Sequence, residues 1–144
     1  MAANSQFAIA VHILAMLANS CDERIKSDYI AKSVNTNPVV IRRLLSTLYE
    51  NGLVVSQTGM CGGSCLTRKA SDIGLLEVYR AVTKGEVFSM HPNTPDQNCF
   101  IGKNIHTVLE KLQAEIDEAI EEKLLKYTLQ DVIEIVEREK SQAV

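Results

Sequence analysis

The sequence predicts a mainly α-helical fold with one small β-hairpin, and three observations support this class. Apolar residues recur every three or four positions in the stretches 40–48, 75–82 and 105–124, which is the helical period. A β-branched run at 53–57 precedes a glycine-rich stretch and a second short run, as in a hairpin. A chain of this length with a hydrophobic fraction of 46% can bury a core without disulfides. We therefore expect one structural domain.

The front of the chain predicts two helices and a tight turn. Residues 7–17 (FAIAVHILAML) are almost continuously apolar, which is typical of a helix buried on most sides. Ser27 has the hydroxyl of an N-cap for a short helix over 28–33. Asp28 then lies in the first turn, where the helix dipole favours an anion. Residues 34–36 form the turn.

A third helix is predicted to begin at Pro38. Asn37 supplies an N-cap side chain, and a proline at the first helical position already has a helical φ. Gly52 supplies a stop after the run PVVIRRLLSTLYEN. The residues expected on the buried face are Val40, Leu44, Leu45 and Leu48. Two helices joined by so short a turn are typical of a helix-turn-helix.

A β-hairpin follows this helix directly. The run LVVSQTG leads into a turn that contains Gly59, Gly62 and Gly63, and SCLTRKA returns from it. A helix-turn-helix followed at once by a hairpin is the winged-helix arrangement.

Residues 71–102 are predicted to form one helix and a long loop. Ser71 or Asp72 caps a helix that continues to about Val82 (IGLLEVYRAV). Residues 84–102 hold two prolines and two glycines, so we expect a connecting loop there.

A long helix is predicted over 103–125, with an apolar seam at steps of three or four. The seam residues are Ile105, Leu109, Leu112, Ile116, Ile120 and Leu124. This seam exceeds what a monomer of this size needs to cover, so we expect a partner helix from a second copy. Thr128 and Asp131 form a capping box for a last helix that ends near Glu139.

Charge and composition favour a nucleic-acid partner over a membrane. Residues 1–70 hold seven Lys/Arg against four Asp/Glu, whereas residues 71–144 hold eight against fourteen. A basic front half on a chain of net charge −3 is compatible with DNA binding. No basic region precedes the apolar N-terminal stretch, so we expect a buried helix rather than a signal or membrane span. A cytoplasmic protein whose four cysteines are mainly thiols is therefore expected.

Catalytic motifs are missing from the sequence. It has no phosphate-binding glycine loop, no nucleophile elbow and no zinc-hydrolase motif. The acidic residues between 110 and 122 fit a solvated helix face rather than paired catalytic carboxylates. We expect neither an enzyme nor a catalytic residue.

Nearly the whole chain resembles the Rrf-two family of bacterial winged-helix transcription regulators, whose members include IscR, NsrR and CymR. The resemblance is carried by the recognition-helix start NTNPVVIRR, the wing GLVVSQTGMCGG and the following LLEVYRAV. Together with NCFIGKNI, the recognition-helix start is similar to members of the YwnA type, which lack the cluster cysteines. The family implies a homodimer with one winged helix-turn-helix per subunit and a long dimerisation helix, here carrying the apolar seam.

The resemblance also implies which residues contact DNA. Family recognition helices contact operator DNA from their first turn, and the wing lies in the minor groove or along the backbone. The positions concerned here are Ser27, Thr36, Asn37, Val39, Val40, Arg42 and Arg43, and in the wing Thr58, Gly59, Gly62, Gly63 and Arg68. Asn and Arg can pair with base edges, and Val can touch a thymine methyl group.

One departure from the family concerns its cofactor. Cluster-binding members carry three cysteines in the loop before the dimer helix, and this chain has only Cys99 there. Iron–sulfur clusters need about four ligands, usually thiolates. We therefore expect no cofactor and no bound metal, and the resemblance transfers the fold and DNA binding alone.

The cysteines are candidate redox thiols. Cys61 and Cys65 flank Gly-Gly-Ser in the wing, and they are either a disulfide-forming pair or hairpin residues with no special chemistry. A zinc knuckle would need a second ligand pair, which is missing nearby. Cys99 is either a reactive thiol near a helix N-terminus or a small buried residue.

These observations predict a dimeric, sequence-specific DNA-binding transcription regulator, expected to be a repressor that responds to thiol oxidation or a small ligand. The alternatives are a winged-helix protein-interaction module without DNA binding and an iron–sulfur-cluster sensor. We expect a winged helix-turn-helix region at 1–83, a connecting or sensor loop at 84–102, and the dimerisation and C-terminal helices at 103–144. The expected partners are a double-stranded DNA operator and a second copy of the chain.

Overall fold

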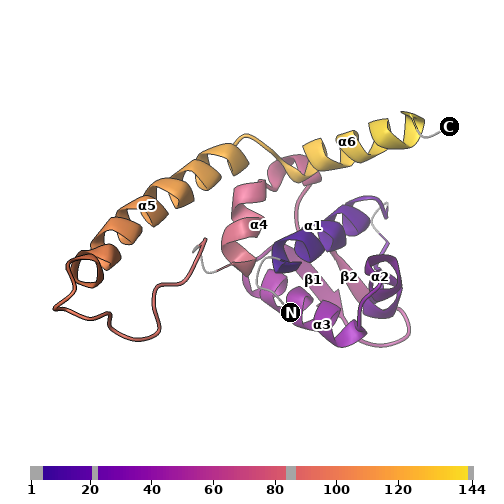
Figure 1. The fold of residues 1–144 in the computed structure, drawn as a ribbon. Helices are drawn as coiled ribbons and strands as arrows, with labels where there is room; N and C mark the ends of the chain where they lie inside the picture. The colour runs from indigo at the N-terminus through magenta and orange to yellow at the C-terminus, as the bar shows by residue number, and fades with distance from the viewer. Residues whose placement is uncertain (1–4, 21–22, 84–86, 143–144) are drawn as a thin grey trace.

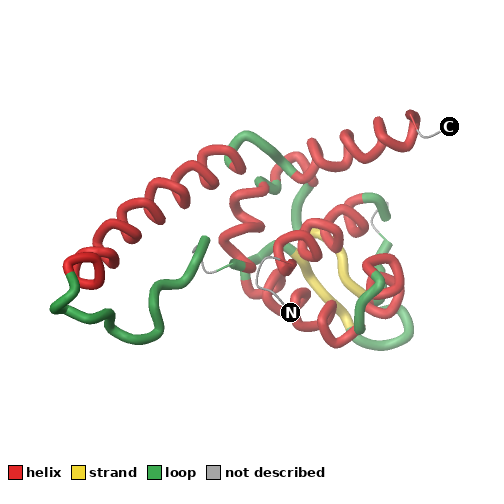
Figure 2. The backbone as a smooth tube through the Cα atoms, viewed as in Figure 1, coloured by secondary structure: helices red, strands yellow, loops and turns green. Residues whose placement is uncertain are grey.

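The structure, a computed structural model, describes residues 5–20, 23–83 and 87–142. It is mainly helical, with one two-stranded antiparallel hairpin, as the sequence predicts (Figures 1 and 2). In chain order its elements are α1 (Ser5–Ala18), α2 (Ser27–Val34), α3 (Pro38–Glu50), β1 (Val54–Gln57), β2 (Gly63–Leu66), the 3₁₀ helix η1 (Ala70–Asp72), α4 (Leu75–Val82), α5 (Phe100–Leu124) and α6 (Leu129–Gln142).

Helix α1 is the centre of the body of the molecule, by which we mean α1 to α4 with the hairpin. It contacts α2, α3, α4, α6 and strand β2. The largest fully buried side chains of the core are Ile13, Leu14, Ile30, Ile41, Leu48, Leu53, Ile73, Leu129, Val54 and Val78. Burial of this apolar surface is the main favourable contribution to the stability of the body.

The helix-turn-helix is formed by α2 and α3. Asn35 ends α2 in the left-handed conformation at φ 63°, which an asparagine tolerates better than most residues. The Asn37 side chain accepts a hydrogen bond from the Val39 amide, and Pro38 is the first helical residue, as predicted. The predicted N-cap of α2 is wrong. Lys26 holds that position without a side-chain bond, and Ser27 is the first helical residue, whose hydroxyl accepts a hydrogen bond from Arg42.

The buried face of α3 differs by one residue from the prediction. Ile41, Leu44, Leu45 and Leu48 are buried, whereas Val40 is only half-buried. Gly52 follows the helix at φ 73°, and the Leu53 amide bonds back to the Leu48 carbonyl. The predicted stop is therefore confirmed, because a glycine adopts this φ without strain.

The hairpin has the predicted two strands, joined by residues 58–62. Val54 pairs with Leu66 and Gln57 pairs with Gly63. Ser64 also forms a bridge to Ile25, which attaches the wing to the segment before α2. The loop end of β2 is therefore attached to the body, whereas residues 58–61 of the tip are exposed.

Helix α4 begins later than predicted. Its N-cap is Gly74, which has no side chain to donate or accept, and Ser71 and Asp72 belong to the preceding η1. The Leu75 amide instead bonds to the carbonyl of Tyr127, just before α6. A contact distant in sequence thus replaces the predicted local cap.

Helix α5 is an arm that extends from the body (Figure 1). It begins at Phe100, three residues before the predicted start. The Cys99 thiol caps it by accepting a hydrogen bond from the Gly102 amide at 3.5 Å. No residue of α5 is buried, although the whole helix is described. Arg80 of α4 and Glu121 of α5 form an ion pair at 3.2 Å, which attaches the end of the arm to the body.

The predicted capping box begins α6. The Thr128 amide bonds to the Asp131 carboxylate at 2.8 Å, and the Asp131 amide bonds to the Thr128 hydroxyl at 3.2 Å. The helix ends at Gln142, beyond the predicted Glu139, and it packs on α1 and η1. Within the described residues no helix is long and apolar enough to cross a lipid bilayer.

Candidate DNA-binding surface

The outer face of α3 is an exposed stripe of four residues, Val39, Arg42, Arg43 and Ser46, which we call the α3 stripe. They recur at steps of three, one and three, so they share the side of the helix opposite Ile41, Leu44 and Leu48. Val39 is 52% exposed although it is apolar.

The start of α3 holds three further predicted contact residues. The Asn37 side-chain oxygen is 2.9 Å from the Val39 amide, so this oxygen is already occupied by the cap. Asn37 is exposed as a residue. Thr36 and Val40 are half-buried. The structure therefore brings these residues next to the α3 stripe.

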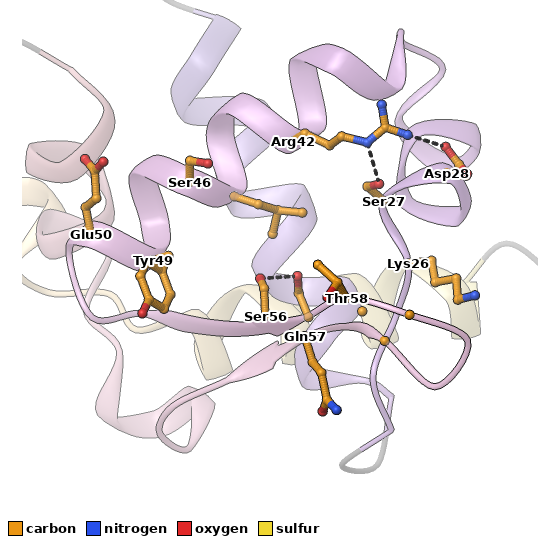
Figure 3. A pocket seen from close by; sticks show the side chains of 15 residues that line it. Lys26, Ser27, Asp28, Arg42, Ser46, Tyr49, Glu50, Ser56, Gln57 and Thr58 are labelled. Atoms are coloured by element: carbon orange, nitrogen blue, oxygen red, sulfur yellow. Dashed lines mark hydrogen bonds and ion pairs between the residues drawn. The ribbon is translucent and has the colours of Figure 1, made fainter.

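The two arginines of the stripe have different surroundings. Arg42 donates from Nε to the Ser27 hydroxyl at 3.2 Å and from Nη2 to the Asp28 carboxylate at 3.1 Å. The Arg43 side chain has no hydrogen bond or ion pair with any of the described residues, although its backbone carbonyl accepts from the Thr47 hydroxyl. Figure 3 shows the Arg42 guanidinium directed toward the beginning of α2.

An open groove runs between α3 and the hairpin (Figure 3). One wall is α3 from Arg42 to Glu50, and the other is the hairpin from Ser56 to Ser64. Lys26 lines the end next to α2. The groove thus joins the predicted recognition helix and the predicted wing into one surface.

The glycines of the wing have different structural requirements. Gly59 has φ 102° and open space around it, so the turn requires its backbone conformation. A Cβ at Gly62 would clash with the Gln57 carbonyl, and one at Gly63 would be 2.7 Å from the Ile25 carbonyl. Gly62 and Gly63 therefore allow close packing of the hairpin, and Thr58 and Gly59 are its exposed tip.

Arg68 is directed away from the groove. Its guanidinium donates to the Asp72 carbonyl at 2.9 Å and pairs with Glu77 of α4. It does not line the groove between α3 and the hairpin. The structure does not bring it together with the α3 stripe.

Several residues of this surface were missed by the sequence analysis. Ser46 and Tyr49 extend α3 along the groove, Lys26 lies at its end, and Gln57 lines it from the hairpin. Continuing the helical period from Arg42 by four and seven residues would have found Ser46 and Tyr49. The sequence has no comparable signal for Lys26 or Gln57.

The candidate redox thiols lie in three separate places. Cys61 is exposed in the hairpin loop, Cys65 is half-buried on β2 opposite Val55, and Cys99 is exposed at the start of α5. All three are free thiols. Two further ladder pairs separate Cys65 from the loop, and each residue adds about 3.4 Å. A disulfide needs Cα atoms about 4.4–6.8 Å apart, so we expect the end of the ladder to open when one forms.

The residues present do not fit an iron–sulfur cluster. A cluster needs about four ligands, and the loop before α5 contributes one thiol, Cys99, which already caps the helix. Among the described residues, no three His, Cys, Asp or Glu side chains lie together as a metal site. The donor set therefore supports no step through such a group.

Comparison with known proteins places the chain in a family. The family model for Rrf2, described as an iron-dependent transcriptional regulator, matches residues 3–135. The "Putative HTH-type transcriptional regulator YwnA" of Bacillus subtilis (strain 168) is 44% identical over 131 residues, covering 90% of this chain and 96% of that protein. The predicted resemblance to YwnA-type members is therefore confirmed.

Solved structures agree with the observed fold. The crystal structure of a "putative DNA binding protein" is 38% identical, with a TM-score of 0.70, and covers 89% of this chain and 98% of its own. That of a "putative transcriptional regulator" from Lactobacillus plantarum is 25% identical, with a TM-score of 0.76, and covers 94% and 97%. The matched length, the identity and the winged helix together show that this chain belongs to the Rrf2 (Rrf-two) family of transcriptional regulators.

Proposed function

We propose that the chain is a homodimeric, sequence-specific DNA-binding transcription regulator that acts as a repressor. The observation that carries this proposal is the α3 stripe, which lies exposed beside the groove of the hairpin. An α-helix fits the major groove of B-DNA, and a helix-turn-helix presents its second helix there. The membership of a transcriptional-regulator family supports the same assignment.

In this proposal α3 enters the major groove and the hairpin lies against the neighbouring backbone or minor groove. Val39 contacts a thymine methyl group, and Arg42, Arg43 and Asn37 contact bases or phosphates. The further proposed contacts are Ser27, Thr36, Val40, Thr58, Gly59, Gly62, Gly63 and, from beyond the hairpin, Arg68. The ion pair of Arg68 with Glu77 gives it the weakest support of these residues.

The proposed dimer forms through α5. Its seam of Ile105, Leu109, Leu112, Ile116, Ile120 and Leu124 is half-buried or exposed in one chain, and Leu112 is 46% exposed. A second copy would cover this seam and set the distance between two recognition helices. Such a dimer reads two half-sites of a near-palindrome about one helical turn or more apart.

The proposed regions follow from this division of roles. Residues 1–83 form the winged helix-turn-helix region, and 103–144 the dimerisation and C-terminal helices. The region between them, 84–102, comprises the connecting loop and the first three residues of α5, and 84–86 lie outside the described residues. We place the protein in the cytoplasm, without enzymatic activity.

The proposed signal is either a small ligand or thiol oxidation at Cys61, Cys65 or Cys99.

Binding of Arg43→Ala to DNA tests the proposal. Duplexes selected from a genomic fragment pool by the wild-type protein would be titrated by fluorescence anisotropy at several salt concentrations. Because Arg43 is unpaired, its loss should weaken binding and reduce the slope of log K against log salt by about 0.9 for one phosphate contact. The control Lys140→Ala, on the distant exposed end of α6, should bind as the wild type does. If the wild-type protein selects no fragment, the proposal fails.

Mass spectrometry after peroxide tests the thiol signal separately. A loss of two hydrogens in a peptide spanning 58–68 would show the Cys61–Cys65 disulfide. Two results together would rule out these thiols as the sensor. The peptide stays unmodified, and peroxide changes the DNA binding of neither the wild-type protein nor Cys99→Ser.

A further inference from the structure

Asp28 and Ser27 of α2 both accept hydrogen bonds from the guanidinium of Arg42. We propose that Asp28 is a positioning residue for sequence recognition, which directs the free end of Arg42 toward a guanine of the operator. This inference rests on the proposed function and names one base contact within it.

The hydrogen bonds leave a defined part of the guanidinium unused. Arg42 donates its Nε hydrogen to Ser27 at 3.2 Å and one Nη2 hydrogen to Asp28 at 3.1 Å. A guanidinium has five N–H donors in one plane, so both Nη1 hydrogens and the second Nη2 hydrogen remain. Of these, the second Nη2 hydrogen and one Nη1 hydrogen lie parallel at the end of the fork. This pair matches the O6 and N7 acceptors that guanine alone presents side by side in the major groove.

The carboxylate also opposes the other use of Arg42, which is contact with a phosphate. Asp28 is an exposed anion in the first turn of α2, and its side chain is 73% exposed. Movement of Arg42 to a phosphate would leave Asp28 unpaired close to the negative backbone. A guanine contact needs no such movement, because the guanidinium already has its orientation. Asp28 therefore favours base readout over non-specific attraction.

Arg43 provides a matched comparison on the same helix. It is adjacent to Arg42, equally part of the α3 stripe, and has no partner among the described residues. It is free to follow the nearest phosphate. The two arginines therefore have different roles: Arg42 specifies a base, and Arg43 contributes affinity that does not depend on sequence.

Selection from a pool of random duplexes tests this division. Wild-type protein should select a motif with a guanine in each half-site. Asp28→Ala and Arg42→Lys should lose the preference at that guanine and keep the rest of the motif, since both remove the fixed fork. Arg43→Ala should retain the guanine. Replacing the guanine by 7-deazaguanine, which lacks the N7 acceptor, should weaken wild-type binding about 10-fold or more and leave Asp28→Ala unchanged.

Binding to non-specific duplex separates positioning from damage to the fold. Asp28→Ala removes an anion and frees Arg42 for a phosphate, so non-specific binding should become tighter and its salt slope steeper by about 0.9. A misfolded variant would lose affinity for both kinds of duplex. Unfolding midpoints of the variants would be measured beside that of the wild type.

Two results would overturn the inference. One is that Asp28→Ala selects the same DNA motif as the wild type and is equally sensitive to 7-deazaguanine. The other is weaker binding of Asp28→Ala to specific and non-specific duplexes alike, with an unfolding midpoint equal to that of the wild type. The proposed function survives either result, whereas a wild-type protein that selects no motif overturns both.

Discussion

The body and the α5 arm use the same apolar spacing but differ in burial. In the body, α3 places Ile41, Leu44, Leu45 and Leu48 in the core, and Leu48 is 0% exposed. In the arm, a helix of 25 residues, about 37 Å long, buries none. The apolar face of α3 is buried within one chain, whereas no apolar residue of α5 is buried. Stability and assembly should therefore respond to mutations in different parts of the molecule.

The largest effect is expected in the body. Leu48→Ala removes a fully buried side chain and leaves a cavity, so the free energy of unfolding should fall by about 2–5 kcal/mol. Urea denaturation at fixed protein concentration measures this change. Leu125→Ala, at a leucine that is 73% exposed just after the arm, is the control and should change it by less than about 0.5 kcal/mol. Equal losses for the two variants would contradict the comparison.

An aspartate in the seam should act on assembly. Leu112→Asp puts a charge where the second copy is proposed to pack, so the dimer dissociation constant should rise about 100-fold or more, which corresponds to about 2.7 kcal/mol. Sedimentation equilibrium measures this constant. Ala114→Asp, two residues along and on the outer face of α5, should leave it within about threefold. A dimer unaffected by Leu112→Asp would place the interface elsewhere.

Loss of the side-chain cap of α3 should have an intermediate effect, and this effect should be on the stability of the body. Asn37→Ala leaves the Val39 amide without its partner, which should cost about 1 kcal/mol of unfolding free energy. Thermal or urea unfolding measures it. Asn37→Asp keeps the cap and should restore the stability while adding a negative charge beside the DNA. A normal stability for Asn37→Ala would show that α3 needs no side-chain cap.

The smallest effect is expected at the start of the arm. The Cys99 thiol is a weak acceptor at 3.5 Å from the Gly102 amide, so Cys99→Ala should lower the unfolding free energy by about 0.5 kcal/mol or less. Cys99→Ser supplies a better cap and should equal or exceed the wild type. Hydrogen exchange of the backbone amides at 100–103 reports directly how often the first turn of α5 opens. Faster exchange in Cys99→Ser than in Cys99→Ala would contradict the assigned cap.

The sequence predicts most elements of the fold because their signals are local. Asn37-Pro38, Gly52 and the Thr128–Asp131 box specify helix ends through contacts a few residues away. The errors arise where distant residues decide. Helix α4 begins at Leu75, whose amide bonds to the distant Tyr127 carbonyl, and the Ser27 hydroxyl binds Arg42 of α3.

The candidate site follows the same rule. The family resemblance predicts Val39, Arg42 and Arg43 as DNA contacts, and the structure places them on one exposed stripe. The different surroundings of Arg42 and Arg43 depend on Asp28, which lies in another helix. Spacing along one helix carries no information about that contact.

The stoichiometry of the DNA complex tests the central claim, which is that the body contacts DNA and the arm pairs the bodies. Sedimentation velocity would be measured on a selected duplex with wild-type and Leu112→Asp protein. Two wild-type chains per duplex are expected, and Leu112→Asp should bind as single chains with much weaker affinity. One wild-type chain per duplex, or full-affinity binding of two Leu112→Asp chains, would contradict the claim.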